Sequence, residues 1–222
     1  AGFAIGQMYE SGTGVPKDDQ QAFAWFRKAG DAGSAAGLNA VGYFYDTGLA
    51  VKLDHQIAFD WYMKAAEKGE AAAFANLGNL YETGAGVAVD MKKAFDNYKR
   101  AAELGSPSAM HSLGRMYDGV FIQPDDDAQA LYWYLKAVEA GYEGASASLA
   151  YVYDELYDSD KSAQYFLKAL EEGNDYLIAD LKNLSGFTVV AIKRSLRDKG
   201  LFTGRLSPRV DRRVEKALRS FA

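Results

Sequence analysis

The sequence predicts an all-α fold: an α-solenoid of five helical hairpins with a capping helix, followed by a small basic helical module. Three observations carry this prediction. A small residue recurs every 36 positions, a tyrosine stands three positions after each copy, and a second helix-like segment ending in glycine follows. A fixed period in this range is typical of stacked helical hairpins. The small residues are Gly6, Gly42, Gly78, Gly114 and Ala150, and the tyrosines are Tyr9, Tyr45, Tyr81, Tyr117 and Tyr153.

The first helix of each hairpin carries the small residue, which lets a neighbouring helix approach closely. That contact offsets the helix-propensity cost of glycine, about 1 kcal/mol relative to alanine. We expect the tyrosine one turn later to fill the space between hairpins. A glycine-containing turn follows in the first three hairpins, because glycine adopts positive φ without strain. An acid then stands where it can cap the second helix. These acids are Asp18, Asp54, Asp90 and Asp126.

The second helix repeats the pattern Ala-Phe-x-Trp-Phe/Tyr-x-Lys/Arg-Ala, with small variations. Its apolar residues have the spacing of an amphipathic helix. Each copy is followed by a glycine suited to the position just beyond a helix end. Trp25, Trp61 and Trp133 look like a ligand-binding stripe, but at this periodicity we expect them to pack between hairpins. The terminal glycines are Gly33, Gly69, Gly105 and Gly141.

The repeated motif resembles the Sel1-like repeat family, a relative of the tetratricopeptide repeat. Residues 77–105 match the family motif closely, and the first, second and fourth units match it well. The fourth unit departs at its turn, residues 117–124, and the fifth is four residues shorter with no glycine in its turn. The resemblance implies a solenoid over residues 1–184 that ends in a capping helix at 176–184. Its first helices would line a concave side.

Residues 185–222 form the second predicted domain. They indicate a helix over Val189–Lys199, a turn over Gly200–Pro208 and a helix over Asp211–Phe221. The segment is similar to the small helical peptidoglycan-binding domain found on cell-wall enzymes, which implies peptidoglycan as a candidate ligand. The matching positions are Ile192, Leu196, Gly200–Gly204, Ala217, Leu218 and Phe221, and the departures are Lys193, Ser207, Pro208, Asp211 and Val214.

The net charge of −5 is unevenly distributed. Residues 182–222 carry eleven lysines and arginines against three acids, so the rest of the chain is strongly acidic. Two explanations stay open: the basic segment docks on the acidic body, or it binds an external anionic partner. Nucleic acid is a poor candidate because no aromatic residues interleave with the basic ones. The candidate glycan or anion site comprises Arg205, Arg209, Arg212 and Arg213.

Catalytic chemistry finds little support in the sequence. The chain has no cysteine and two histidines, His55 and His111, neither of them at zinc-ligand spacing. No nucleophile-elbow, phosphate-loop or dinucleotide motif occurs, since the glycines join helix to helix. No segment approaches the ~18 apolar residues of a membrane span. We predict a protein that is not an enzyme, takes no cofactor or metal and inserts no helix of this fragment into a membrane. His55 is expected to be a solvated residue at a helix start.

Four rows of residues are predicted to line the concave face, one member per hairpin. The most distinctive row is acidic in every copy: Glu10, Asp46, Glu82, Asp118 and Asp154. With hairpins about 10 Å apart, this row would attract a basic or extended peptide. Alternatively, the acids only keep helix ends soluble or pair with lysines of the next hairpin. The predicted partner-binding residues are Asn39, Tyr43, Asp46, Asn79, Glu82, His111, Arg115 and Asp118.

The function predicted from these patterns is that of a non-enzymatic scaffold that binds a protein partner on the concave face. The combination of repeats and tail resembles the periplasmic region of PodJ-type bacterial polar localisation factors. That resemblance implies a periplasmic fragment of a larger protein that places cell-envelope machinery. Two alternatives stay open: a peptidoglycan-binding tail with the solenoid as spacer, and a regulatory arm of a larger enzyme.

Overall fold

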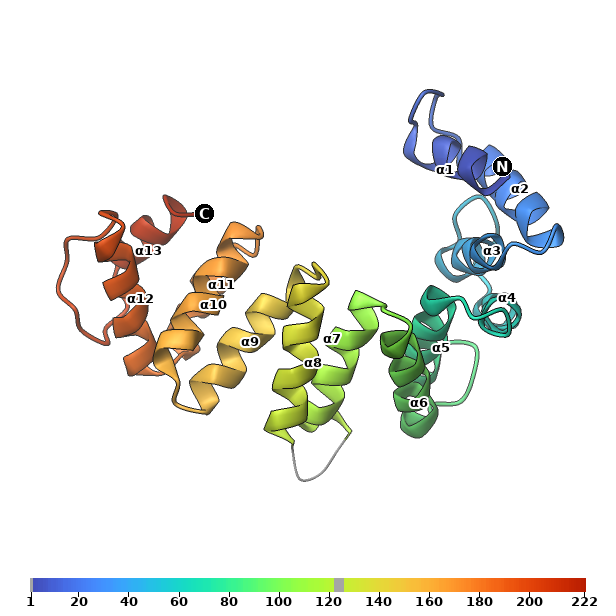
Figure 1. Cartoon of the computed structure of the whole chain (residues 1–222). Coiled ribbons are helices and arrows are strands. Elements are labelled where there is room, and N and C mark those ends of the chain that lie inside the picture. Colours follow the sequence, from blue (N-terminus) through green and yellow to red (C-terminus); the bar gives the residue numbers. More distant parts are fainter. Residues whose placement is uncertain (1, 122–125) are drawn as a thin grey trace. The chain divides into compact units, whose positions relative to one another are not determined.

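The computed structural model describes residues 2–121 and 126–222, and every regular element in that part of the chain is helical (Figure 1). This confirms the predicted all-α fold. The chain divides into two compact units, residues 1–113 and 114–222. The first unit holds α1 (Gly2–Ser11), α2 (Asp19–Asp31), α3 (Ala35–Thr47), α4 (His55–Ala66), α5 (Ala71–Thr83) and α6 (Met91–Glu103). Helix α7 (Pro107–Arg115) spans the boundary, and the second unit continues with a π-helical turn (Met116–Val120), α8 (Asp127–Glu139), α9 (Gly144–Glu155), α10 (Ser159–Glu171), α11 (Leu177–Asp180), a 3₁₀ turn (Leu181–Asn183), α12 (Gly186–Asp198) and α13 (Arg212–Arg219).

The boundaries of the second helices follow from local chemistry, as predicted. Each begins directly after an aspartate whose carboxylate accepts backbone N–H groups of the first turn, which satisfies donors that the helix itself cannot pair. These capping residues are Asp18, Asp54, Asp90 and Asp126. Just beyond the ends of these helices, the glycines Gly33, Gly69, Gly105 and Gly141 have φ between 81° and 91°. A side chain would be strained in that conformation, which explains the recurring glycine.

In the first four hairpins, the glycine of the first helix packs against an aromatic ring of its own second helix. A Cβ placed on Gly42 would lie 2.6 Å from the ring of Tyr62, and one on Gly78 would lie 2.7 Å from the ring of Tyr98. The prediction of close helix approach is therefore confirmed, and the approach is within the hairpin. Both rings are buried in the hydrophobic core.

The tyrosine three positions later joins successive hairpins, as predicted. Tyr45 of α3 meets Phe23 of α2 with ring centroids 5.8 Å apart, and Tyr81 of α5 meets Phe59 of α4 at 5.6 Å. Of the tryptophans, Trp61 packs against two neighbouring core clusters. Trp25 is half-buried and lies beneath the Lys28 ammonium, 4.8 Å from its ring centroid. Packing between hairpins is therefore shown for Trp61.

In the second unit, the last repeat and the tail share one hydrophobic core. Buried residues of α10, α11, α12 and α13 belong to a single cluster that includes Leu167, Ile178, Ile192 and Leu218. The two predicted tail helices are present as α12 and α13 (Figure 1). The predicted capping helix is short, because it consists of α11 and one 3₁₀ turn. The domain boundary between residues 184 and 185 stays a prediction.

The turns of the fourth and fifth repeats differ from the first three. Part of the fourth turn, residues 122–125, lies outside the described residues; before it, Gly119 has a φ of 84°. In the fifth repeat no glycine is available, and Tyr157 adopts positive φ, 60°, directly before the capping Asp158 of α10. A left-handed residue is therefore needed there even where the sequence supplies a tyrosine.

Candidate functional site

The acidic row at the ends of the first helices is tied into the hairpins. The hydroxyl of Tyr98 donates to Glu82 at 2.8 Å, and that of Tyr134 donates to Asp118 at 3.1 Å. The hydroxyl of Tyr62 donates to Asp46 at 3.3 Å. In each pair the tyrosine stands 16 positions after the acid, on the second helix of the same hairpin. These carboxylates thus anchor the two helices of a hairpin to each other.

Asp46 has a second partner that the sequence did not reveal. The Nδ1 atom of His55 lies 2.7 Å from one carboxylate oxygen of Asp46. His55 stands at the start of α4, as expected, but its side chain is 35% exposed and is held by Asp46 instead of being fully solvated. The pair closes the turn between α3 and α4.

Burial and the nearby carboxylates keep two of these tyrosines, Tyr62 and Tyr134, protonated. Burial, with Asp46 as the next cause, raises the pKa of Tyr62 far above its ordinary value. Burial and then Asp118 raise the pKa of Tyr134 in the same way. The hydroxyls of Tyr62 and Tyr134 therefore remain neutral donors to the carboxylates that they hold in place. The acids contribute a negative electrostatic potential near the first helices, although their carboxylate oxygens already accept hydrogen bonds from the tyrosines.

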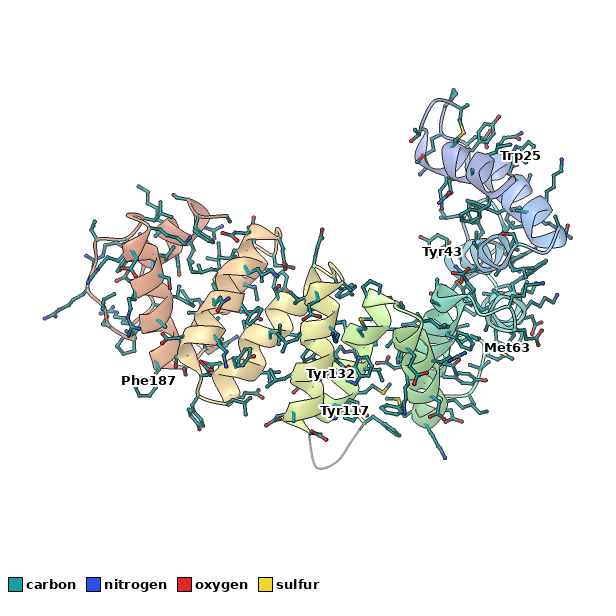
Figure 2. All side chains as sticks on the ribbon, viewed as in Figure 1. Trp25, Tyr43, Met63, Tyr117, Tyr132 and Phe187 are labelled. Carbon is teal, nitrogen blue, oxygen red and sulfur yellow. The ribbon has the colours of Figure 1, made fainter. Side chains whose placement is uncertain are left out.

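A second row on the first helices of the first unit is exposed. Gln7, Tyr43 and Asn79 occupy equivalent positions on α1, α3 and α5, and all three are exposed. Figure 2 shows the side chain of Tyr43 extending from α3. We call these three residues the exposed row. One turn later, the hydroxyls of Ser11, Thr47 and Thr83 donate to the backbone carbonyls of the same three residues.

The other predicted partner-binding residues are half-buried. Asn39 of α3 accepts a hydrogen bond from the side-chain amide of Asn76 on α5 at 3.0 Å, which joins successive first helices. His111 and Arg115 are half-buried on α7. The predicted set divides between the units, with Asn39, Tyr43, Asp46, Asn79, Glu82 and His111 in the first and Arg115 and Asp118 in the second.

The four arginines of the predicted anion site lie around one hollow. This hollow has a volume of about 480 Å³ and precedes and borders the start of α13. We call it the arginine hollow. It is lined by Arg205, Ser207, Arg209, Asp211, Arg212 and Arg213.

The described residues contain neither a cluster of metal-ligating side chains nor a helix that could span a membrane. Over residues 2–121 and 126–222, no three histidine, aspartate or glutamate side chains gather closely enough to hold a metal ion. In the same part of the chain, no helix combines the length and apolar character needed to span a bilayer.

Comparison with known proteins identifies relatives of the repeat array. A family model described as Sel1 repeat matches residues 2–34, 35–70, 71–106, 107–142 and 147–174. A Sel1 repeat protein from Oxalobacter formigenes is 29% identical, covers 99% of this chain and 84% of its own length, and has a TM-score of 0.77. No curated protein matches the chain.

Two further solved structures share the architecture. The Escherichia coli protein c5321, a protective antigen present in uropathogenic strains, is 26% identical with a TM-score of 0.70. That match covers 90% of this chain and 45% of c5321. The immunity protein Pa5087 of Pseudomonas aeruginosa is 21% identical with a TM-score of 0.58, covers 97% of this chain and 79% of its own, and so shows a shared fold alone. Solenoids of this repeat are typically non-catalytic scaffolds for protein–protein interaction.

Proposed function

The chain belongs to the Sel1 repeat family, and from that premise we propose that it is a non-enzymatic adaptor whose exposed row binds an extended, basic segment of a protein partner. The observation that carries the proposal is the recurrence of exposed hydrogen-bonding side chains at one repeat position, Gln7, Tyr43 and Asn79. Tyrosine and amide groups suit a peptide backbone because they both donate and accept hydrogen bonds.

The spacing of the row fits an extended chain. Packed helices lie about 10 Å apart, and an extended peptide advances about 3.3 Å per residue. Each residue of the exposed row would therefore contact about every third residue of the ligand. Tyr43, at 42% exposure, offers the largest contact area of the three.

The charge near the row favours a basic partner. Asp46 and Glu82 stand one turn from Tyr43 and Asn79, and neutral tyrosine donors do not cancel their negative charge. A half-buried carboxylate is less screened than a fully solvated one, so it steers and orients cationic groups more effectively. The acids then act as a fixed field, and the exposed row makes the contacts.

A peptide library tests the proposal. We expect the protein to enrich extended peptides that carry lysine or arginine, and we expect Tyr43→Ala to weaken the best of them by about tenfold, as loss of a central aromatic contact does. Tyr132→Ala is the matched control, because Tyr132 is 50% exposed but lies on α8, a second helix (Figure 2). If no peptide class is enriched, or if both variants bind alike, the proposal fails.

Further parts of the proposal concern the setting of the adaptor. The resemblance of the tail to peptidoglycan-binding domains supports a periplasmic adaptor in a bacterial envelope, with an architecture like that of PodJ-type localisation factors. A second candidate is a peptidoglycan-binding module with the solenoid as spacer, and the clustering of four arginines at one hollow favours it. Sedimentation with purified cell-wall sacculi separates the two, because an adaptor without glycan affinity stays in the supernatant.

A further inference from the structure

The arginine hollow combines a fixed frame with unpaired positive charge. From this combination we propose that it is a binding site for an oxyanion, a phosphate or carboxylate group displayed by a larger ligand. The inference does not rest on the exposed row, because the hollow belongs to residues 114–222 and the row to residues 1–113.

The frame of the hollow is a buried lysine. The side chain of Lys193 on α12 is fully buried, and its ammonium donates to the backbone carbonyls of Ser207 at 3.0 Å and Arg209 at 2.5 Å. A buried ammonium is tolerated only when hydrogen-bonded, so these two carbonyls are held toward α12. The segment that carries Arg205 and Arg209 is therefore anchored at two points, which preorganises the side chains that leave it.

The acid at the hollow, Asp211, pairs with one of the four arginines, Arg213. Asp211 caps α13: its carboxylate accepts the backbone N–H groups of Arg213 at 2.9 Å and Val214 at 3.2 Å. It also lies 3.4 Å from the Arg213 guanidinium. Because Asp211 occupies the first N–H groups of α13, the helix end is already satisfied. The binding capacity of the hollow must come from side chains.

Three guanidinium groups of the hollow have no partner within residues 2–121 and 126–222. The side chains of Arg205, Arg209 and Arg212 make no hydrogen bond or ion pair there, and all three residues are exposed. Of the other arginines of the tail, Arg194 pairs with Asp160 at 3.2 Å and Arg197 donates to the carbonyl of Gly204, whereas Arg219 is exposed outside the hollow. Three unpaired guanidinium groups are thus gathered at the hollow.

This arrangement has the chemistry of oxyanion recognition. Like charges held together repel one another, and an anion bound among them relieves that repulsion. The planar guanidinium presents paired N–H donors that match the two oxygens of a carboxylate or phosphate. Because the fork geometry suits both groups, both are members of the proposed ligand class.

Calorimetric titration tests the site, with tripolyphosphate as the phosphate probe and citrate as the carboxylate probe. The double variant Arg209→Gln/Arg212→Gln removes two guanidinium groups from the hollow. The matched control Lys182→Gln/Arg219→Gln removes the same charge from two exposed positions of the basic segment 182–222 that lie outside the hollow. We expect the hollow variant to bind at least one probe about tenfold more weakly than the wild type, as loss of two charge-assisted bonds implies.

The control should bind within about twofold of the wild type, and the salt dependence of binding should flatten only in the hollow variant, because fewer ion pairs are formed. Preference for tripolyphosphate identifies a phosphate ligand, and preference for citrate identifies a carboxylate ligand; both support the site. Absence of binding of both probes by the wild type overturns the proposal, as does an equal loss in the two double variants.

Discussion

The middle repeats and the last repeat hold the same acid in different ways. In the second, third and fourth hairpins, a buried tyrosine of the second helix donates to the acid that ends the first helix. In the fifth, the equivalent second-helix position is Phe166, which has no hydroxyl. Its acid, Asp154, instead accepts bonds from the tail. The backbone N–H and hydroxyl of Ser185 approach at 2.8 and 2.6 Å, and the hydroxyl of Thr188 at 2.5 Å.

The difference shows how a repeat can be adapted to end an array. The acid of a middle hairpin accepts a hydrogen bond from a tyrosine 16 residues further along the chain. Asp154 accepts its hydrogen bonds from residues 31 and 34 positions further along. Ser185 caps α12, because its side chain accepts from the backbone N–H of Thr188, and the Asp154 carboxylate holds that capping residue in place through its backbone N–H and hydroxyl. One position in the repeat serves hairpin closure in the middle of the array and attachment of the tail at its end.

The largest effect is expected at the small residue beneath the aromatic ring. The third hairpin has Gly78 there, 2.7 Å from the Tyr98 ring if a Cβ is added, and the fifth already carries Ala150. Gly78→Val should lower the free energy of unfolding by about 3 kcal/mol, because the buried ring cannot move aside without overpacking. Urea unfolding measures it.

The control for that change is Ala150→Gly. It should lower the free energy of unfolding by about 1 kcal/mol, through helix propensity and a lost methyl contact. A loss at Gly78→Val no larger than at Ala150→Gly would show that the ring does not enforce the glycine.

Detachment of the tail is expected next. Asp154→Ala removes the acceptor of three hydrogen bonds, among them the one that the buried Thr188 hydroxyl donates, which should destabilise α12 by about 2 kcal/mol. Hydrogen exchange of the α12 amides measures the local opening. Asp160→Ala is the control, because that aspartate is 80% exposed in its ion pair with Arg194 and should leave exchange unchanged. Unchanged protection of α12 in Asp154→Ala would contradict the proposed attachment.

The tyrosine pairing inside the array is expected to have a smaller effect. Tyr98→Phe keeps the buried ring and removes the hydroxyl that donates to Glu82 at 2.8 Å. The free energy of unfolding should fall by about 1 kcal/mol, the net value of one such bond. Phe166 shows that the fold accepts an apolar ring at this position, so a loss well above about 1 kcal/mol in Tyr98→Phe would indicate a role of the hydroxyl beyond this bond.

The same pairs predict a dependence on alkaline pH. Burial and Asp46 raise the pKa of Tyr62 in the folded protein, so above about pH 10 the unfolded chain releases a proton that the folded chain retains. The stabilisation from this group is complete below the unfolded pKa and is lost as the pH rises toward the folded one. Tyr62→Phe should therefore lose stability less steeply than wild type between about pH 9 and 11. Parallel unfolding curves for the two proteins would rule out the shift.

Much of the fold was predictable because its determinants are local or periodic. The capping aspartates, such as Asp90, and the terminal glycines, such as Gly105, act within a few residues of chain. The pairing of Glu82 with Tyr98 was missed because it joins two helices, although the joint recurrence of acid and tyrosine is a signal for it. The bonds from Ser185 to Asp154 have no repeating counterpart, so periodicity offers no route to them.

The candidate sites were predictable in part. Tyr43 and Asn79 were selected by their repeat positions, and the structure places both at the surface of the first unit. Asp46 was selected for its charge, but its contacts with Tyr62 and His55 depend on tertiary packing. The arginines of the hollow are close in sequence, and their clustering follows from that. Lys193, which anchors the segment, was identified only as a departure from a family pattern.

The smallest effect is expected at the turn of the fifth repeat, and its sign is opposite. Tyr157 holds a φ of 60° while its side chain is 84% exposed, so the tyrosine gives up little packing there. In the equivalent turns of the third repeat, Gly84 and Gly86 take positive φ without penalty. Tyr157→Gly should raise the free energy of unfolding by about 0.5 kcal/mol, because relief of left-handed strain exceeds the entropy cost of glycine. Tyr132→Gly, in the interior of α8, is the control and should destabilise, because the helix there has no positive-φ position to relieve. A loss of stability in Tyr157→Gly would mean that contacts of the exposed ring outweigh the backbone strain. The difference in stability between the two turns would then come from side-chain contacts and not from the backbone angle φ.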